Sequence, residues 1–166
     1  LGLYPVVLTE GLSAEAKEVG KVLAALARQI ESHEEPFKPP CILLSGGEMI
    51  VTVGRETGIG GRNQECVLST ALRIAGSKRI TIGSVDTDGT DGPGTQFVGG
   101  AEKICLAGAI ADGYTLERAR NANIDLVEEL NRHNSTIPLL KLDDGIKAEQ
   151  GISMNDITVV LISRNK

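Results

Sequence analysis

A continuous apolar run near the end of the chain, residues 157–163 (ITVVLIS), most constrains the fold. A strand with one face in water alternates polar and apolar residues, whereas a strand buried on both faces is apolar throughout. The run is therefore typical of a strand in the middle of a sheet that helices cover on both sides. A sheet of that kind is found in α/β proteins with three layers.

A long amphipathic helix is predicted near the start of the chain. Apolar residues recur at a spacing of three and four over residues 13–34, which places them on one face of a helix. Ser13 precedes this pattern as an N-cap, and Pro36 ends it. The apolar positions are Leu12, Ala16, Val19, Leu23, Leu26 and Ile30.

Further strands and helices follow along the chain. The sequence predicts strands at residues 4–9 and 79–85 and short helices at residues 115–123 and 126–132. Residues 103–111 form an apolar run whose period fits a helix or a strand, and Pro138 interrupts the next segment. Strands alternating with helices predict a single α/β domain over residues 1–166, with three layers and a mixed, mostly parallel sheet.

A short polar segment separates two β-rich runs, residues 41–44 and 49–53. It consists of Ser45, Gly46, Gly47 and Glu48. The two glycines can supply the positive φ of a tight turn, which predicts a β-hairpin. The polar side chains and free backbone amides also make this segment a candidate ligand-binding loop.

A glycine-rich segment, residues 58–65 (GIGGRNQE), precedes an apolar run that continues to Ala75. This pattern predicts a loop that leads into the start of a helix, where backbone N–H groups have no partner within the helix. Such a helix start is a ready site for an anion such as phosphate or carboxylate. We therefore place the centre of the candidate site here.

Three carboxylates, those of Asp86, Asp88 and Asp91, lie within six residues directly after the predicted strand at 79–85. Like charges this close repel each other, so such a cluster usually faces solvent, a cation or a basic partner. A further polar loop, residues 151–156, precedes the last strand. Ligands of α/β sheets bind beyond the carboxyl ends of the strands, and these loops could converge there.

Charge and composition argue against several classes of partner. The formal net charge of −5 and the absence of a Lys and Arg cluster argue against nucleic acid. No apolar run reaches the roughly 20 residues of a membrane span, so no membrane association is expected. The cysteines, three in number and far apart, favour buried thiols in a reducing compartment and hence the cytoplasm. The start at Leu1 rather than Met indicates a fragment of a longer protein.

Several nucleotide and metal motifs are incomplete. Asn63 stands at the third glycine position of a dinucleotide fingerprint, so an NAD(P)-dependent reductase is only an alternative. The chain has no Walker loop, and Phe97 stands at the twelfth position of a calcium loop, which excludes an EF-hand. Asp86 and Asp88 after a strand resemble the first motif of haloacid-dehalogenase-like phosphotransferases, with a nucleophile and a general acid/base. That activity stays a second alternative.

Five motifs in order resemble the MOFRL domain, the C-terminal half of the class II glycerate 2-kinases, which have also carried the label hydroxypyruvate reductase. The motifs are SGGE (residues 45–48), GGRNQE (60–65), TDGTDGP (87–93), AGAIADG (107–113) and G-x-x-x-ND (151–156). The resemblance covers nearly the whole chain. It departs from the family in extra residues between Pro93 and Ala107, and at His133 and Asn134, where the family more often has Asn-Asp.

The resemblance implies an enzyme that transfers the γ-phosphoryl group of ATP to D-glycerate with Mg²⁺, giving 2-phosphoglycerate. Its active site would lie between this module and an N-terminal kinase domain that the chain lacks, so the isolated chain would be inactive. Arg62 would clamp a phosphoryl or carboxylate oxygen, and Asp88 with Asp91 would hold Mg²⁺ or orient the hydroxyl. The candidate catalytic residues are Arg62 and Asp88, the metal residues are Asp88 and Asp91, and the candidate substrate- or phosphate-binding residues are Ser45, Gly46, Gly47, Gly60, Gly61, Asn63, Gln64 and Asn155.

Residues of the glycine-rich segment also have structural interpretations. Arg62 would pair with Asp88 and hold two loops together. Asn63 and Gln64 would cap the first turn of the helix, and Glu65 would interact favourably with the helix dipole. These interpretations stay open beside the catalytic ones.

Structural interpretations apply elsewhere as well. Asn155 and Asp156 would form a turn before the last strand. His33 and His133 stand among charged residues that water would solvate, and neither is expected to be a catalyst. For the whole chain, a non-catalytic interaction module and a homodimer both stay open.

Overall fold

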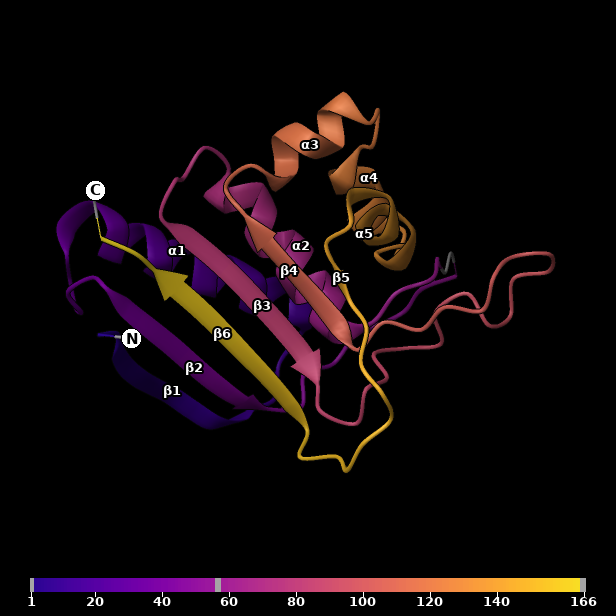
Figure 1. Ribbon diagram of the computed structural model, residues 1–166, viewed down its shortest axis with the longest axis horizontal. Coiled ribbons are helices and arrows are strands. Elements are labelled where there is room, and N and C mark those ends of the chain that lie inside the picture. Colours follow the sequence, from indigo (N-terminus) through magenta and orange to yellow (C-terminus); the bar gives the residue numbers. More distant parts are fainter. Residues whose placement is uncertain (1, 56–57, 165–166) are drawn as a thin grey trace.

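The computed structural model describes residues 2–55 and 58–164, which form one mixed six-stranded sheet with helices beside it (Figure 1). In chain order the elements are β1 (Tyr4–Leu12), α1 (Ala16–His33), β2 (Cys41–Gly47), α2 (Arg62–Ile74), β3 (Ile80–Asp86), β4 (Gly108–Asp112), α3 (Thr115–Asn121), α4 (Leu126–Asn131), α5 (Thr136–Leu142), β5 (Gly145–Ile146) and β6 (Asp156–Ile162). None of these helices is long and apolar enough to cross a membrane.

The strands lie in the order β1-β2-β6-β3-β4-β5. β1 and β2 are parallel, whereas β6 is antiparallel to β2 and β3, and β4 is antiparallel to β3 and β5. The α/β class and the mixed sheet are confirmed. The observed sheet differs in detail from the mostly parallel arrangement that was expected. β6 begins at the carboxyl ends of β2 and β3 and runs antiparallel to both strands, between them.

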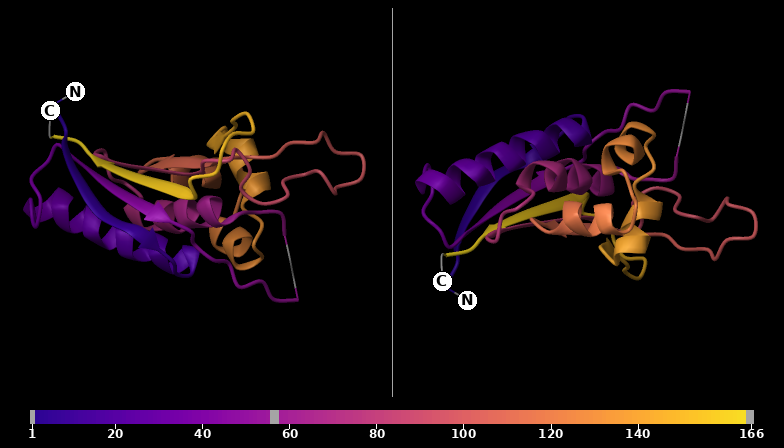
Figure 2. Two further views of the ribbon diagram at one scale, coloured as in Figure 1. Left: turned by 90° about the horizontal axis from the view of Figure 1, so that it is seen from below. Right: turned by 90° about the horizontal axis from the view of Figure 1, so that it is seen from above.

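Helices α1 and α2 cover one face of the sheet, while the small helices α3, α4 and α5 lie towards its β4–β5 side (Figures 1 and 2). Along β6, Val160 and Ile162 are buried, whereas Ile157 on the other face is 38% exposed. On that second face Val7 is 61% and Ile110 is 44% exposed. The described residues thus form two layers rather than the three expected, although β6 is apolar on both faces.

The hairpin predicted around the two glycines of β2 is wrong. β2 extends through these glycines and pairs with β1 and β6, and residues 49–53 form no strand beyond an isolated bridge between Ile50 and Glu15. Gly47 has a φ of 141° and lies directly against the backbone of Leu12. The glycine therefore permits close contact at an irregularity in the β1–β2 pair rather than a reverse turn.

Other predicted elements are present with shifted ends. α1 begins after Glu15 rather than after Ser13. The ambiguous apolar run, residues 103–111, overlaps a strand, β4, at Gly108–Asp112. Pro138 does not interrupt its segment but is the third residue of α5, where a missing N–H is tolerated because the first-turn N–H groups have no partner within the helix.

Candidate functional site

The start of α2 is capped by a carboxylate from another part of the chain. Its N-cap residue is Gly61, which has no side chain to accept hydrogen bonds. Asp91 instead accepts them from the backbone N–H groups of Asn63, at 3.1 Å, and Gln64, at 2.9 Å. A Cβ at Gly61 would overlap the backbone and the carboxyl group of Asp91, so only glycine allows this approach. The anion position of this helix start is therefore occupied by Asp91.

Asp91, Asn63 and Gln64 form a buried polar frame around this cap. Asp91 is 1% exposed, and burial raises the pKa of its carboxyl group while hydrogen bonds from Gln64 and Asn63 oppose the shift. Gln64 donates to the carbonyl of Asp91 and accepts from Thr136, and Asn63 accepts from the hydroxyl of Ser84. Both amide side chains are completely buried. Asn63 and Gln64 are therefore enclosed in the protein, where their side chains hydrogen-bond to other residues of the chain.

Arg62, the first residue of α2, lies between two buried aspartates at neighbouring strand ends. Its Nη2 donates to Asp86 Oδ2 at 2.5 Å, and its Nε lies 2.9 Å from each oxygen of Asp156. Strand pairing sets Asp86 directly opposite Asp156, so one guanidinium reaches both. Burial opposes the charge of Arg62, but Asp156 and then Asp86 outweigh it and raise the guanidinium pKa. Arg62 therefore pairs with Asp86 and Asp156 rather than with Asp88.

Asp156 is a site residue with no role assigned from the sequence, where it belongs to the G-x-x-x-ND motif and to an expected turn. It is 2% exposed and accepts hydrogen bonds from Arg62, from Asn63 Nδ2 at 2.8 Å and from the backbone N–H of Met49 at 2.9 Å. The available signal was a carboxylate at the first position of a buried strand, because such a charge requires a partner. Asp156 thereby connects β6, α2 and the segment that follows β2.

A cavity of about 580 Å³ lies beside Arg62 and the glycine-rich loop. The side chains of Arg62, Glu48, Glu65 and His133 are on its wall. Within the described residues, Nη1 of Arg62 makes no hydrogen bond, and Oε1 of Glu48 lies 3.9 Å from it. Of the predicted site residues, the cavity brings together Gly60, Gly61, Arg62 and Asp91.

The remaining predicted site residues do not line this cavity. They are Ser45, Gly46, Gly47, Asn63, Gln64, Asp88 and Asn155. Asp88 is half-buried in the loop after β3, where its Oδ1 accepts a hydrogen bond from the N–H of Thr90 at 2.8 Å. Asn155 has a φ of 63°, and its carbonyl accepts from the N–H and the hydroxyl of Thr87. This geometry fits the turn interpretation of Asn155, whose side chain is exposed.

Glu65 and His133 form a pair on the cavity wall. Nδ1 of His133 lies 2.8 Å from Oε1 of Glu65. Glu65 is 1% exposed, and burial raises its pKa although His133 partly offsets the shift. Its Oε2 is buried without a hydrogen-bond partner among the described residues. The expectation of a solvated His133 is wrong, because its side chain is only 12% exposed.

The glycine-rich loop holds the segment that carries His133. The N–H of Gly58 donates to the carbonyl of Arg132 at 2.6 Å. A Cβ at Gly60 would overlap the carbonyl of His133. These glycines therefore allow two distant segments to touch, which sets His133 beside the first turn of α2.

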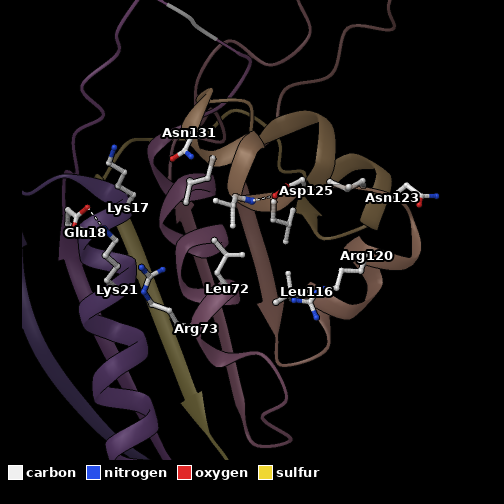
Figure 3. A pocket seen from close by; sticks show the side chains of 14 residues that line it. Lys17, Glu18, Lys21, Leu72, Arg73, Leu116, Arg120, Asn123, Asp125 and Asn131 are labelled. Carbon is white, nitrogen blue, oxygen red and sulfur yellow. Dashed lines mark hydrogen bonds and ion pairs between the residues drawn. The ribbon is translucent and has the colours of Figure 1, made fainter.

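A larger hollow, of about 1030 Å³, lies between α1, α2, α3 and α4 (Figure 3). Lys17, Lys21 and Arg73 stand on its α1–α2 side and Arg120 on its α3 side. Lys21 is paired with Glu18 at 2.6 Å, and no predicted site residue lines this hollow. We place the candidate site at the smaller cavity, where buried charges converge.

The chain belongs to the MOFRL family, since residues 41–157 match the sequence model of that family. The matched range includes the glycine-rich loop, Arg62 and the aspartates that surround its guanidinium. The resemblance seen in the sequence is thereby confirmed.

The chain is similar over its full length to larger proteins. It is 32% identical to a glycerate 2-kinase of Pyrococcus horikoshii and covers 36% of that protein. It is 38% identical over 97% of its length to an Agrobacterium vitis protein that carries the name hydroxypyruvate reductase, and covers 40% of it. The crystal structure of Thermotoga maritima glycerate kinase has a TM-score of 0.88 and 33% identity over 97% of this chain, again covering 36% of the larger chain. This chain thus spans little more than a third of the curated relatives it matches.

Proposed function

We propose that this chain is the C-terminal module of a glycerate 2-kinase, which transfers the γ-phosphoryl group of ATP to D-glycerate and gives 2-phosphoglycerate. Membership of the MOFRL family and the names of the Pyrococcus and Thermotoga relatives support this reaction. Because this chain covers only 36% of each of these relatives, we propose that an N-terminal kinase domain completes the active site.

The observation that carries the proposal is the fixed guanidinium of Arg62 beside the cavity. Asp86 and Asp156 hold two of its nitrogens, which leaves Nη1 for a ligand. A planar guanidinium suits an oxygen of a phosphoryl or carboxylate group, and a group already held in place stabilises developing charge without reorganisation. Arg62 therefore acts as the clamp of the transferred phosphoryl group or of the glycerate carboxylate.

The surroundings of Arg62 are acidic, which supports a requirement for a cation. The carboxylates of Glu48, Asp86 and Asp156 lie around one guanidinium. Asp88 is adjacent, since its backbone N–H donates a hydrogen bond to Oδ1 of Asp86. A phosphate would be repelled here unless positive charge were added. Bound Mg²⁺ would neutralise part of the charge on the phosphates.

Asp88 fits a Mg²⁺ ligand better than Asp91. Asp88 is half-buried, and within the described residues only its Oδ1 accepts a hydrogen bond. Both oxygens of Asp91 cap α2, so Asp91 is not available to a metal. The described residues hold no group of three or more His, Cys, Asp or Glu side chains that could bind a metal alone. Phosphate oxygens and the N-terminal domain would supply the remaining ligands.

Two alternative activities are less well supported by the geometry. A phosphotransferase with Asp86 as nucleophile would require a free carboxylate, but Asp86 is 5% exposed and bound to Arg62. A dinucleotide-dependent reductase would place a pyrophosphate at a helix start, but Asp91 occupies that position at α2. The assay described below distinguishes the proposed kinase from a non-catalytic interaction module.

The test uses the full-length protein that contains this chain, with ATP, Mg²⁺ and D-glycerate, and identifies the product by ³¹P NMR. Arg62→Lys keeps the charge but loses the planar fork, and we expect turnover to fall by about 100-fold. Arg120→Lys, on the exposed surface of α3, is the control and should leave turnover unchanged. Turnover of Arg62→Lys within about threefold of wild type would contradict the clamp, and absence of 2-phosphoglycerate from wild type would contradict the proposed function.

A further inference from the structure

Glu65 and His133 line the cavity beside Arg62 but take no part in its frame of aspartates. When Oε1 of an ionised Glu65 accepts a hydrogen bond from Nδ1–H, the neutral imidazole carries its lone pair on Nε2. Among the described residues Nε2 has no hydrogen-bond partner, and it is not one of their fully buried unpartnered atoms. This nitrogen is therefore accessible to solvent, on a residue that lines the cavity.

A purely structural hydrogen bond does not account for the pair. Buried carboxylate oxygens normally accept hydrogen bonds, yet Oε2 of Glu65 has no partner in the part of the chain that the structure describes. The φ of 54° at His133 has a structural cause, because this left-handed residue ends α4 with a hydrogen bond from its N–H to the carbonyl of Leu130. A buried carboxylate oxygen without a partner, beside a histidine that lines a cavity, is typical of a functional site.

We propose that His133, oriented by Glu65, accepts the proton of the hydroxyl group that is phosphorylated, an inference that rests on the proposed function. The O–H bond of the 2-hydroxyl breaks and its proton moves to Nε2 of His133. The hydroxyl oxygen forms the new bond to the γ-phosphorus while the bond to the β-phosphate oxygen breaks and ADP leaves. Glu65 stays ionised and stabilises the imidazolium that forms.

Several other charged groups act on this pair. Arg62, Glu48 and Asp91 line the same cavity, and near Glu65, Lys17 lowers its pKa whereas Glu15 raises it. The pH dependence of the reaction therefore has to be compared with variants that alter only the pair. The substitutions below keep the other five groups unchanged.

The first test measures kcat and KM of the full-length protein against pH. His133→Gln keeps an N–H for Glu65 but cannot take up a proton, so kcat should fall by about 100-fold, KM for D-glycerate should change little, and the acidic limb of the profile should vanish. Glu65→Gln should move that limb to lower pH, because the imidazolium loses its anionic partner. His33→Gln, at the exposed end of α1, is the matched control and should behave as wild type.

A second variant separates the proton transfer from packing. His133→Gly suits the left-handed backbone and opens space for a free ring. Added imidazole should restore turnover, whereas pyrazole, a ring of the same size and much lower basicity, should not. Equal rescue by both rings would overturn the proposal, since it would show that the ring only fills space.

A third measurement does not depend on activity. The ¹⁵N shifts of labelled histidine report the tautomer, and we expect His133 to be protonated on Nδ1 and free on Nε2 near neutral pH. The opposite tautomer would overturn the proposal. Wild-type activity with an unchanged acidic limb in His133→Gln would overturn the role of His133 alone, whereas a wild type without glycerate kinase activity would overturn the proposed function and this step with it.

Discussion

The carboxylate of Asp91 accepts a hydrogen bond from the backbone N–H of Gln64, which lies 27 residues earlier in the chain. Helix caps usually come from the residue directly before the helix. Here Gly61 occupies that position, and the cap comes from the loop that follows β3. The start of α2 and this loop are therefore one unit.

Asp91→Ala should destabilise the fold more than loss of an ordinary cap. It leaves the buried N–H groups of Asn63 and Gln64 without an acceptor, and we expect the free energy of unfolding to fall by about 2–4 kcal/mol. Asp125 is the matched control, since it caps α4 locally at the surface, and Asp125→Ala should cost about 1 kcal/mol. Urea denaturation measures both, and a smaller loss for Asp91→Ala than for Asp125→Ala would contradict the long-range cap.

The buried Glu65 should make stability fall as pH rises. Burial raises its pKa above the ordinary 4.5, so the stability that its proton contributes is fully present below 4.5 and is lost as pH rises through the folded-state value. Glu65→Gln cannot ionise and should gain stability relative to wild type as pH increases. Urea midpoints between about pH 4 and pH 8 test this expectation.

The control for this pH dependence is Glu18→Gln, which should show the opposite sign. The hydrogen bond from Lys21 lowers the pKa of Glu18, so the stability that Glu18 contributes is present above 4.5 and is lost as pH falls. A difference between Glu65→Gln and wild type that stays constant or declines with rising pH would contradict the raised pKa of Glu65.

Arg62 and Asp156 should be coupled in stability. Arg62→Met leaves the buried Asp86 and Asp156 facing each other without a counter-charge, and we expect a loss of about 2–3 kcal/mol. Adding Asp156→Asn removes one of these charges and should recover about 1 kcal/mol or more of it. A double-mutant cycle by thermal or urea unfolding gives the coupling, and simple additivity of the two substitutions would show that the pair is not a unit.

Gly61→Ala should be destabilising for a steric reason. The backbone of Gly61 has a φ of −154°, which any residue can adopt, but the new Cβ would overlap Asp91. We expect a loss of about 1–3 kcal/mol. Gly11→Ala, where a Cβ meets nothing within 4 Å, should change stability by less than about 0.5 kcal/mol. Equal stability of the two variants would contradict the close approach of Asp91.

Features that depend on local pattern could be predicted from the sequence. The apolar spacing of α1, the loop before α2 and the apolar run of β6 each gave the correct element type. The pairing of β6 could not be predicted, because it depends on two strands that are distant in the chain. The same limit explains the hairpin error, since Gly47 serves a contact with Leu12 that its neighbours in sequence do not indicate.

The candidate site could likewise be predicted only where it depends on local sequence. Arg62 and its helix start were found from local sequence, whereas its partner Asp156 lies 94 residues away. His133 stands among polar neighbours in the sequence, but it contacts Glu65, 68 residues earlier. Side chains that become partly buried through distant contacts leave no periodic signal along the chain.

β6 is the last of the six strands in chain order, yet it lies between β2 and β3 in the sheet. Without it, β1 with β2 and β3 with β4 and β5 would be separate sheets with open inner edges. Its pairing joins residues as distant as Cys41 and Ile162, and contacts of such separation slow folding. During synthesis these inner edges have no partner strand until residues 156–162 have been made, and unpaired strand edges tend to pair with other chains.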